Sequence, residues 1–273
     1  MPELPEVETI ARDLRPRLVG AAIVRFRVFK PEILRGIGGR ALAHALAGRR
    51  IAAVFRRAKH LVIVLDDGRR LVIQPRMTGS LRVLKGKEAP DRYVALAARL
   101  STGGLLAYRD VRRLGTVQLL TPSAWERYSA RLGPEPLAPG FTAARLSAAL
   151  AGGRLAVKKA LMDQRRLAGV GNIYANEALW DAGIDPSRPA GAVEAAAARR
   201  LHRALRAVLR RSIRGRGTTV RDYRTGTGEA GTFQSRLNVY GRARKPCRRC
   251  GRRIVLTHAV DARATYFCPG CQR

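Results

Sequence analysis

The apolar positions of this chain follow two different periods, one in each half. After a helical segment over about residues 5–18, short apolar runs of strand length stand at 22–29, 51–56, 60–65, 70–74, 94–100, 105–108 and 116–119. Several runs alternate between apolar and polar residues, and turns containing glycine follow at 66–68 and 101–104. Strands at this spacing predict a β-sandwich or barrel.

The second half of the chain is predicted to be helical. Apolar residues recur at helical spacing over 143–150, 157–163, 173–182 and 193–213. A stretch rich in proline and glycine at 132–141 is the expected linker between the halves. Residues 216–234 lack a period and are rich in glycine, threonine and arginine, which predicts a long functional loop.

All four cysteines lie near the end of the sequence. Cys247, Cys250, Cys268 and Cys271 form two Cys-x-x-Cys pairs with 17 residues between them. Such pairs can place four thiolates around one structural Zn²⁺, whose binding would provide the folding free energy of so small a module. Two disulfides are the alternative, which a reducing compartment disfavours.

Charge adds a partner to this picture. The chain carries 53 Lys and Arg against 20 Asp and Glu, a formal net charge of +33, spread along its whole length. This balance indicates a folded protein that binds a polyanion, most simply nucleic acid. No apolar run approaches the ~20 residues of a membrane-spanning helix, and the first residues do not resemble a secretory signal. We therefore expect no membrane partner and a cytoplasmic location.

The second residue is a candidate nucleophile. A methionine before proline is commonly removed, which would leave Pro2 as a free secondary amine beside Glu3. An amine that attacks an aldehyde-like carbon forms a Schiff base, which acts as an electron sink. The alternative is that Pro2 and Pro5 only begin a helix. Gly169 and Gly171, just before a predicted helix, likewise suit either a phosphate site or an ordinary turn.

Four separated segments resemble the formamidopyrimidine-DNA glycosylases. They are PELPEVET at 2–9, the string from 163 to 177 that contains GVGNIYANE, VYGR at 239–242, and the four-cysteine segment. The resemblance covers nearly the whole chain in the same order. The first two strings are typical of this family and of its endonuclease VIII-like relatives.

The resemblance implies an α+β multidomain fold. Its parts are an N-terminal β-sandwich with flanking helices (1–131), the linker (132–141), a helix–two-turn–helix domain (142–238) with a lesion-capping loop (about 216–234), and a β-hairpin zinc finger (239–273). The implied partner of the monomer is double-stranded DNA with oxidised bases or abasic sites. The implied reaction is excision of 8-oxoguanine and formamidopyrimidines, followed by β,δ-elimination at the abasic site.

The resemblance also assigns the chemistry to particular residues. Pro2 would attack C1′ of the sugar, and Glu3 would act as general acid and base. Lys59 would contact a phosphate and donate a proton, and Arg263 would hold the phosphates that flank the lesion. Glu6 matches a supporting carboxylate, or is only an acid at a helix N-terminus.

Other positions match DNA contacts of the family. Lys158 and Asn172 match phosphate contacts, which position DNA without reading its sequence. Met77, Arg112 and Leu114 match residues that fill the space left by a flipped base. Arg112 would also contact the orphaned partner base.

Some of these residues have a simpler interpretation, and two depart from the family pattern. Lys59 alone would be read as a solvated charge, and Met77 and Leu114 as core residues. Leu114 stands where purine-specific members usually carry phenylalanine, and Tyr93 where a DNA-contacting histidine is common. The loop at 216–234 favours the purine branch over an endonuclease VIII-like enzyme for oxidised pyrimidines. A non-catalytic zinc-containing DNA-binding protein and an RNA-binding zinc-ribbon protein are the alternatives of another class.

Overall fold

The computed structural model describes residues 2–84 and 88–273, which form two compact units. The first unit comprises the described part of Met1–Ala130 together with Gly215–Thr232. The second comprises Arg131–Arg214 and Phe233–Arg273. Each unit is described by itself below.

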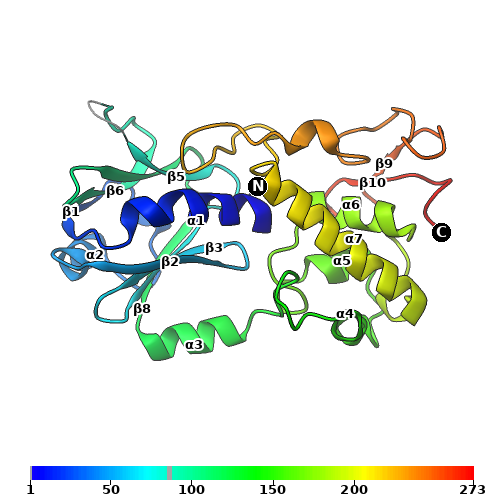
Figure 1. Cartoon of the computed structure of the whole chain (residues 1–273), viewed down its shortest axis with the longest axis horizontal. Helices are drawn as coiled ribbons and strands as arrows, with labels where there is room; N and C mark the ends of the chain where they lie inside the picture. Colours follow the sequence, from blue (N-terminus) through cyan, green and yellow to red (C-terminus); the bar gives the residue numbers. More distant parts are fainter. Residues whose placement is uncertain (1, 85–87) are drawn as a thin grey trace. The chain divides into compact units, whose positions relative to one another are not determined.

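The first unit contains two four-stranded antiparallel sheets (Figure 1). One has the strand order β1 (Ile23–Val28), β6 (Val94–Leu100), β7 (Leu105–Asp110), β5 (Gly79–Leu84). The other has the order β2 (Ile51–Arg57), β3 (His60–Leu65), β4 (Arg70–Gln74), β8 (Thr116–Leu120). Buried residues of both sheets, such as Phe26, Leu106 and Ile63, share one hydrophobic core. The predicted β-sandwich is therefore confirmed.

Helix α1 (Leu4–Leu18) packs its apolar face against β2 and β3. Val7, Ile10 and Leu14 recur at helical spacing and are fully buried. Two polar contacts add to this packing. The Arg15 guanidinium donates to the Val54 carbonyl at 2.9 Å, and Arg56 pairs with Glu8 at 3.0 Å. A helix end fixed in this way keeps the start of the chain in one place.

Three elements of the first unit were absent from the sequence-based prediction. They are α2 (Gly39–Leu46), β5 and α3 (Pro122–Ala130), besides the short helix η1 (Pro31–Ile33). Helix α2 buries only Leu42 and Leu46, and α3 buries only Trp125. One or two buried positions are too few to show a helical period. The fold, and not the local pattern, defines these elements.

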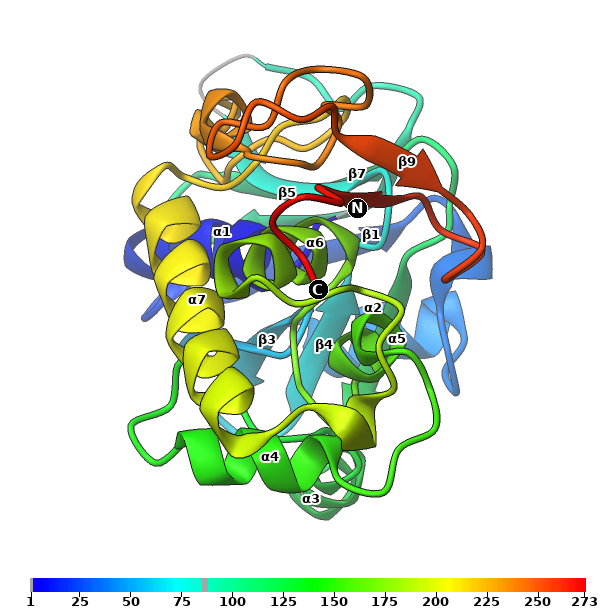
Figure 2. The same ribbon diagram turned by 90° about the vertical axis from the view of Figure 1, so that its right-hand side faces the viewer.

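The second unit is built around helix α6 (Asn172–Ala182). Its other elements are α4 (Ala143–Leu150), α5 (Val157–Met162), α7 (Ala195–Arg214), β9 (Val255–Thr257), β10 (Thr265–Phe267), η2 (Ala190–Ala192) and η3 (Phe233–Arg236). Helix α6 packs against α5, α7 and β10, and lies between α7 and the strand pair (Figures 1 and 2). The four predicted helices and the C-terminal hairpin are thus confirmed. In the described part of the chain, no helix is both long and apolar enough to cross a membrane.

The loop Gly215–Thr232 packs with the first unit, although its sequence position placed it in the helical domain. Its contacts with α1 explain the difference. The Asp13 carboxylate accepts hydrogen bonds from the Arg216 side chain and the Gly226 N–H, each at 3.0 Å. The Tyr223 hydroxyl lies 3.3 Å from the Glu6 carbonyl and is buried in the core of the sandwich.

Helix α3 is connected to the start of β3 through a buried histidine. His60 Nδ1 lies 3.2 Å from the Arg57 carbonyl, so Nδ1 carries the proton. His60 Nε2 then accepts the Tyr128 hydroxyl proton at 2.9 Å. Burial, aided by the cations Arg57, Lys59 and Arg76, lowers the pKa of His60 from 6.5 to about 4. The ring is therefore neutral at physiological pH.

The low pKa of His60 predicts a pH-dependent stability. Between about pH 6.5 and pH 4 the unfolded chain binds a proton at His60 that the folded chain does not. As the pH falls through this window, the free energy of unfolding should decrease by up to about 3 kcal/mol. Urea unfolding of a His60→Gln variant should lack this component, whereas the exposed-site control His44→Gln should keep it. An unchanged pH profile in His60→Gln would contradict the assignment.

Candidate active site and DNA-binding residues

Glu6 connects the start of α1 to the loop Gly215–Thr232. Pro2, Glu3 and Glu6 are all buried. The Glu6 carboxylate accepts the Glu3 N–H and the Thr218 N–H, each at 2.8 Å. The first bond satisfies a backbone donor at the helix N-terminus, as the simpler interpretation of this residue required. The second holds the loop against the same helix end, which that interpretation did not include.

The loop approaches Glu6 so closely that one of its residues must be glycine. Gly217 has φ +86°, a conformation that favours glycine. A Cβ atom there would lie 2.9 Å from the Tyr223 ring and 3.1 Å from Glu6 Oε1. Glycine thus allows the loop backbone to reach the buried carboxylate.

Lys59 lies in the turn between β2 and β3. The turn is tight, since Ala58 has a positive φ of 52°. His60, on the next position, is fixed by Tyr128 as described above. Lys59 is only 6% exposed, so it is not a solvated surface charge. The two strands that flank this turn, β2 and β3, pack against α1, the helix that begins beside Pro2.

The three void-filling candidates lie on two loops. Met77 is in the β4–β5 loop and is 44% exposed, and Leu114 is in the β7–β8 loop and is 39% exposed. Their interpretation as core residues is therefore wrong. Arg112, on the second loop, extends a guanidinium nitrogen to within 3.6 Å of the Met77 sulfur.

A buried carboxylate holds these two loops together. Asp110 is 1% exposed and accepts hydrogen bonds from the Thr78 hydroxyl at 2.5 Å, the Tyr108 hydroxyl at 3.1 Å and the Gly115 N–H at 2.7 Å. Thr78 Oγ1 in turn accepts the Arg112 N–H at 3.0 Å. Each bond to a charged group contributes about 1.5–3 kcal/mol. Met77 and Arg112 are thus presented by one connected framework.

Tyr93 lies between two arginines. The guanidinium carbons of Arg92 and Arg109 are each 4.8 Å from the centre of its ring, and Arg92 also contacts its hydroxyl at 2.6 Å. Asp91 pairs with Arg109 at 2.6 Å on the same side. Cation–π contacts of this kind hold the ring in place at the start of β6. Two guanidinium groups therefore contact the Tyr93 ring.

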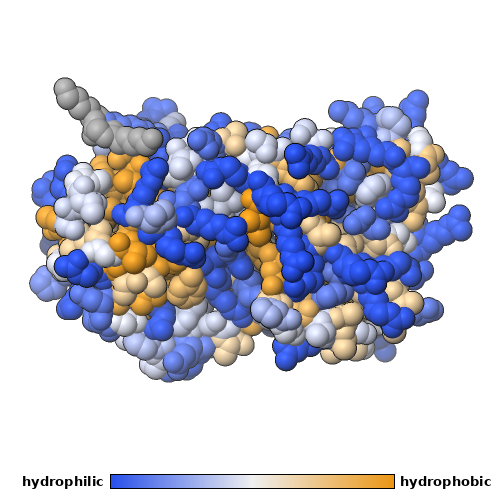
Figure 3. All heavy atoms as spheres, in the orientation of Figure 1, coloured by the Kyte–Doolittle hydropathy of each residue, from blue (hydrophilic) through white to orange (hydrophobic). Residues whose placement is uncertain are grey.

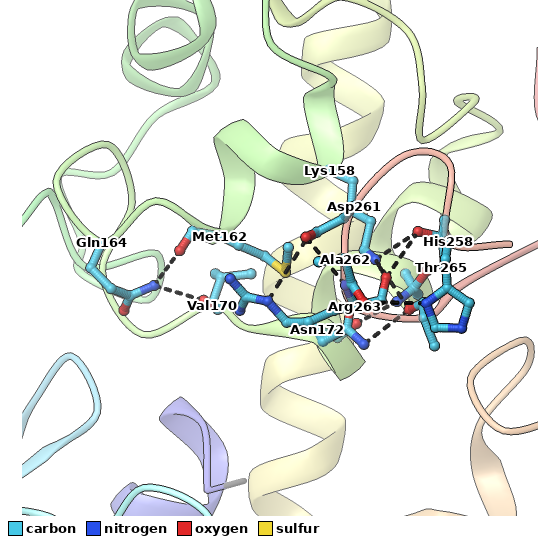
Figure 4. A network of polar contacts seen from close by, with 12 residues as sticks. Lys158, Met162, Gln164, Val170, Asn172, His258, Asp261, Ala262, Arg263 and Thr265 are labelled. Atoms are coloured by element: carbon cyan, nitrogen blue, oxygen red, sulfur yellow. Dashed lines mark hydrogen bonds and ion pairs between the residues drawn. The ribbon is translucent and has the colours of Figure 1, made fainter.

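In the second unit, Gln164 shapes the glycine turn before α6 (Figure 4). Its amide nitrogen donates to the carbonyls of Met162 and Val170, each at 2.8 Å, and its oxygen accepts the Gly169 N–H at 2.9 Å. Gly169 has φ +83°. The Gln164 side chain thus closes the turn that leads to Asn172.

Lys158 and Asn172 both bind the loop between β9 and β10 (Figure 4). Lys158 Nζ donates to the carbonyls of Arg263 and Ala264 at 3.1 Å each, and to Thr265 Oγ1 at 2.8 Å. Asn172 Nδ2 donates to the Ala264 carbonyl at 3.0 Å. Lys158 has no exposed surface, and burial lowers its pKa to about 8. Its three donor positions are occupied by protein oxygens.

Arg263 is presented to solvent by this anchored loop. Its side chain is 55% exposed, and its guanidinium lies 3.8 Å from the carboxylate of Asp261. The Arg263 N–H lies 3.3 Å from the other Asp261 oxygen. The backbone is therefore held from both sides while the guanidinium remains accessible.

The four cysteines form one cluster suited to a metal ion. Their sulfur atoms all lie within 4.8 Å of one another, and no two of them form a disulfide. The Cys247–Cys271 and Cys250–Cys268 sulfur distances are 3.9 and 3.4 Å. Tetrahedral coordination with Zn–S bonds of about 2.3 Å requires sulfur distances of about 3.8 Å. Burial and the neighbouring sulfurs raise the pKa of Cys271 to about 12, so a bound cation would be needed to hold all four as thiolates.

Sequence reasoning missed the acid that attaches this module to α6. Glu177 is buried, and its carboxylate accepts the N–H groups of Asn238, Val239 and Tyr240 at 2.8 to 2.9 Å. Asn176 accepts the Tyr266 N–H at 2.9 Å. An amide and an acid side by side, Asn176 and Glu177, in the middle of a largely apolar helix were the available signal.

Two family models identify the class to which this fold belongs, the DNA glycosylases that carry a helix–two-turn–helix domain. Residues 1–117 match the formamidopyrimidine-DNA glycosylase N-terminal domain, and residues 132–224 match the H2TH domain of the same enzymes. The chain belongs to the formamidopyrimidine-DNA glycosylase family.

Relatives and solved structures of the same family match this chain over nearly its whole length. The formamidopyrimidine-DNA glycosylase of Thermomicrobium roseum is 44% identical over 287 residues, covering 100% of this chain and 99% of the relative. The Lactococcus lactis FPG mutant G226P, solved with Fapy-dG-containing DNA, gives a TM-score of 0.93 at 32% identity and covers 100% of both chains. The MutM (Fpg) protein of Thermus thermophilus gives 0.88 at 39% identity, over 99% of this chain and 98% of that one.

The contacts of Lys158 predict that it positions the Arg263 loop. A Lys158→Met variant should increase hydrogen exchange over 261–266 and weaken binding to abasic DNA by about tenfold or more, since three hydrogen bonds to the loop are lost. The matched control is Lys159→Met at the exposed neighbouring position, which should change neither. A lysine that only contacts a phosphate would instead leave exchange unchanged and reduce the salt slope of binding by about 0.9.

Proposed function

We propose that this chain excises oxidised purines, such as 8-oxoguanine and formamidopyrimidines, from duplex DNA and then cleaves the abasic strand by β,δ-elimination through a Schiff base on Pro2. One observation carries the proposal: Pro2 stands at the buried start of α1, beside the carboxylates of Glu3 and Glu6. The Lactococcus lactis relative has been solved with Fapy-dG DNA and with abasic DNA, which supports the same substrates here.

The first step is displacement of the base. The target nucleotide must leave the stack before its sugar can be reached, at a cost of a few kcal/mol. The Pro2 nitrogen attacks C1′, the bond from C1′ to the base breaks, and the base leaves with a proton. Glu3 protonates the sugar ring oxygen as the ring opens to the iminium ion.

The second step is strand cleavage. The iminium ion withdraws electrons, so a proton is lost from C2′ and the C3′–O bond breaks to release one phosphate. A second elimination removes the C4′ proton, breaks the C5′–O bond and releases the other phosphate. Lys59 supplies a proton and a positive charge in these steps, and Arg263 holds the departing phosphates. Hydrolysis of the iminium ion then frees Pro2.

This chemistry requires that Met1 be removed, because only then is Pro2 a free secondary amine. An unperturbed α-amino group titrates near pKa ~8, so part of it is a nucleophile at neutral pH. Glu6 keeps the amine in place by fixing the Glu3 backbone. Because the substrate is genomic DNA, we also propose that the chain works in the cytoplasm in association with the nucleoid.

Met77, Arg112 and Leu114 are proposed to fill the space of the flipped base. Met77 and Leu114 are exposed large apolar side chains, and the Asp110 framework holds Met77 beside Arg112. Leucine has no ring to stack on neighbouring bases, so we expect a weaker wedge than phenylalanine would give. Tyr93, stacked between its two arginines, is proposed to contact the DNA backbone.

In the second unit, Arg263 is the proposed phosphate ligand of the Cys-containing module. Lys158 and Asn172 support it through the loop backbone. We propose that residues 142–214 and the segment 233–273, which contains the four-cysteine module, act together as one DNA-binding element. The bound metal is proposed to be one zinc ion, since four thiolates in a closed tetrahedral set are typical of structural zinc.

The Schiff base predicts a covalent product with a defined attachment point. Borohydride added during reaction with abasic DNA should trap an adduct, and peptide mapping should place it on Pro2 with Met1 absent. Pro2→Leu should retain Met1, abolish this adduct and lower the cleavage rate by about a thousandfold or more. Pro5→Ala, which alters the same helix turn but not the amine, is the control. An adduct on Lys59 would contradict the assignment.

The zinc site predicts that one metal ion per chain is required for DNA binding. Elemental analysis should find one zinc per chain. Removal with a thiol-competing chelator should unfold β9 and β10 and weaken abasic-DNA binding by about a hundredfold, because the module has little apolar core of its own. Zinc added back should restore binding. Full binding by metal-free protein would show that Glu177 and Lys158 alone hold the module.

A further inference from the structure

Helix α7 carries an arginine stripe along its solvent-facing side. The stripe consists of Arg199, Arg203, Arg206, Arg210 and Arg214. With about 100° per residue, these positions fall within an arc of about 80°. The buried residues of α7, among them Leu201, Leu205 and Val208, lie on the opposite arc.

The stripe is a concentrated positive surface. Four of its residues, Arg199, Arg203, Arg210 and Arg214, are exposed, and none of them forms an ion pair within the described ranges 2–84 and 88–273. Arg206 is half-buried and donates to the carbonyls of Pro136 and Ala138. Helix α7 itself contains no acidic residue. The space-filling view shows hydrophilic side chains over this helix (Figure 3).

This arrangement has a cost in the isolated protein. Like charges at spacings of three and four residues repel one another along a helix. A polyanion bound along the stripe would offset this repulsion.

The stripe is separate from the proposed phosphate ligands of the same unit. Arg263, Lys158 and Asn172 belong to the loop before β10 and to the helices beside it. Helix α6 lies between α7 and the strand pair (Figures 1 and 2). A duplex held by Arg263 therefore does not account for the charge on the outer side of α7.

We propose that the arginine stripe binds the phosphate backbone of a second DNA duplex while the lesion site holds the first. The stripe runs about 22 Å along the helix. Duplex DNA presents one negative charge per about 1.7 Å of its axis, so several phosphates lie within reach of each arginine. An anionic membrane is a poorer partner, because the exposed apolar residues of α7 are all alanines (Ala195, Ala196 and Ala207), which offer little side chain for insertion. Contact with a second duplex would let the enzyme transfer between DNA segments.

The test measures binding of the second duplex while the lesion site is already occupied by the first. The full chain is first saturated with a short unlabelled duplex that carries an abasic-site analogue. A labelled undamaged duplex is then titrated, with anisotropy read at several salt concentrations. Wild-type protein should bind it with a steep salt dependence. The variant R199Q/R203Q/R210Q/R214Q should bind at least about tenfold more weakly, with a salt slope smaller by up to about 3.6.

A charge-matched control keeps the result specific. R25Q/R27Q/R40Q/R99Q removes the same charge from exposed positions on β1, α2 and β6 and should retain the second-duplex affinity. Both variants should excise lesions from short duplexes at the wild-type rate, so a failure of the catalytic proposal would be seen separately. Unchanged thermal midpoints confirm folding. Equal affinity of the two variants, no second duplex on the wild type, or tighter binding to anionic vesicles would overturn the proposal.

Discussion

The buried carboxylate of Glu6 is the interaction on which the first unit's site depends. A chain terminus normally frays, yet the proposed nucleophile stands next to it. Here the apolar face of α1 is packed on β2 and β3, and Glu6 accepts the Glu3 N–H at the first turn. The same carboxylate accepts the Thr218 N–H, so the loop and the helix end share one acceptor. Movement of the loop at this point would break the Thr218 hydrogen bond to a buried carboxylate, which is costly.

The second unit also depends on hydrogen bonds between buried charged side chains and backbone groups. Its four-cysteine module is small, and much of its attachment to α6 is polar. Glu177 accepts three consecutive backbone N–H groups, and Lys158 donates to three oxygens around Arg263. Hydrogen bonds of charged groups are strong and directional, so they set the orientation of the module as well as its position. A bound metal ion would stabilise the fold of the hairpin, and the contacts from α5 and α6 would set its orientation.

The site residues of this protein therefore have two kinds of role. Pro2, Glu3, Lys59 and Arg263 are proposed to touch the substrate. Glu6, Asp110, Lys158 and Glu177 act on backbone groups and hold the loops from which the first set extends. The distinction explains why a lysine that resembles a phosphate contact has no exposed surface. It also explains why Met77 and Leu114 can remain exposed: the framework beneath them, and not their own burial, fixes their position.

The sequence by itself determined the class of fold, the strands of the sandwich other than β5, the four main helices of the second unit and the cysteine cluster. These follow from local periodicity and residue spacing, which are properties of the sequence alone. It also pointed to Pro2, through its position and the motif that follows it.

Only the tertiary structure decided what depends on distant partners. Helices α2 and α3 bury too few residues to be seen in the pattern. The loop at 216–234 was counted with the helical domain, but Glu6 and Asp13 hold it against α1. The acceptors of Lys158, about a hundred positions away in the sequence, and the donors to Asp110 came from the fold as well. A hydrogen bond depends on the distance and direction between two groups in space. The residues next to each group in the sequence determine neither.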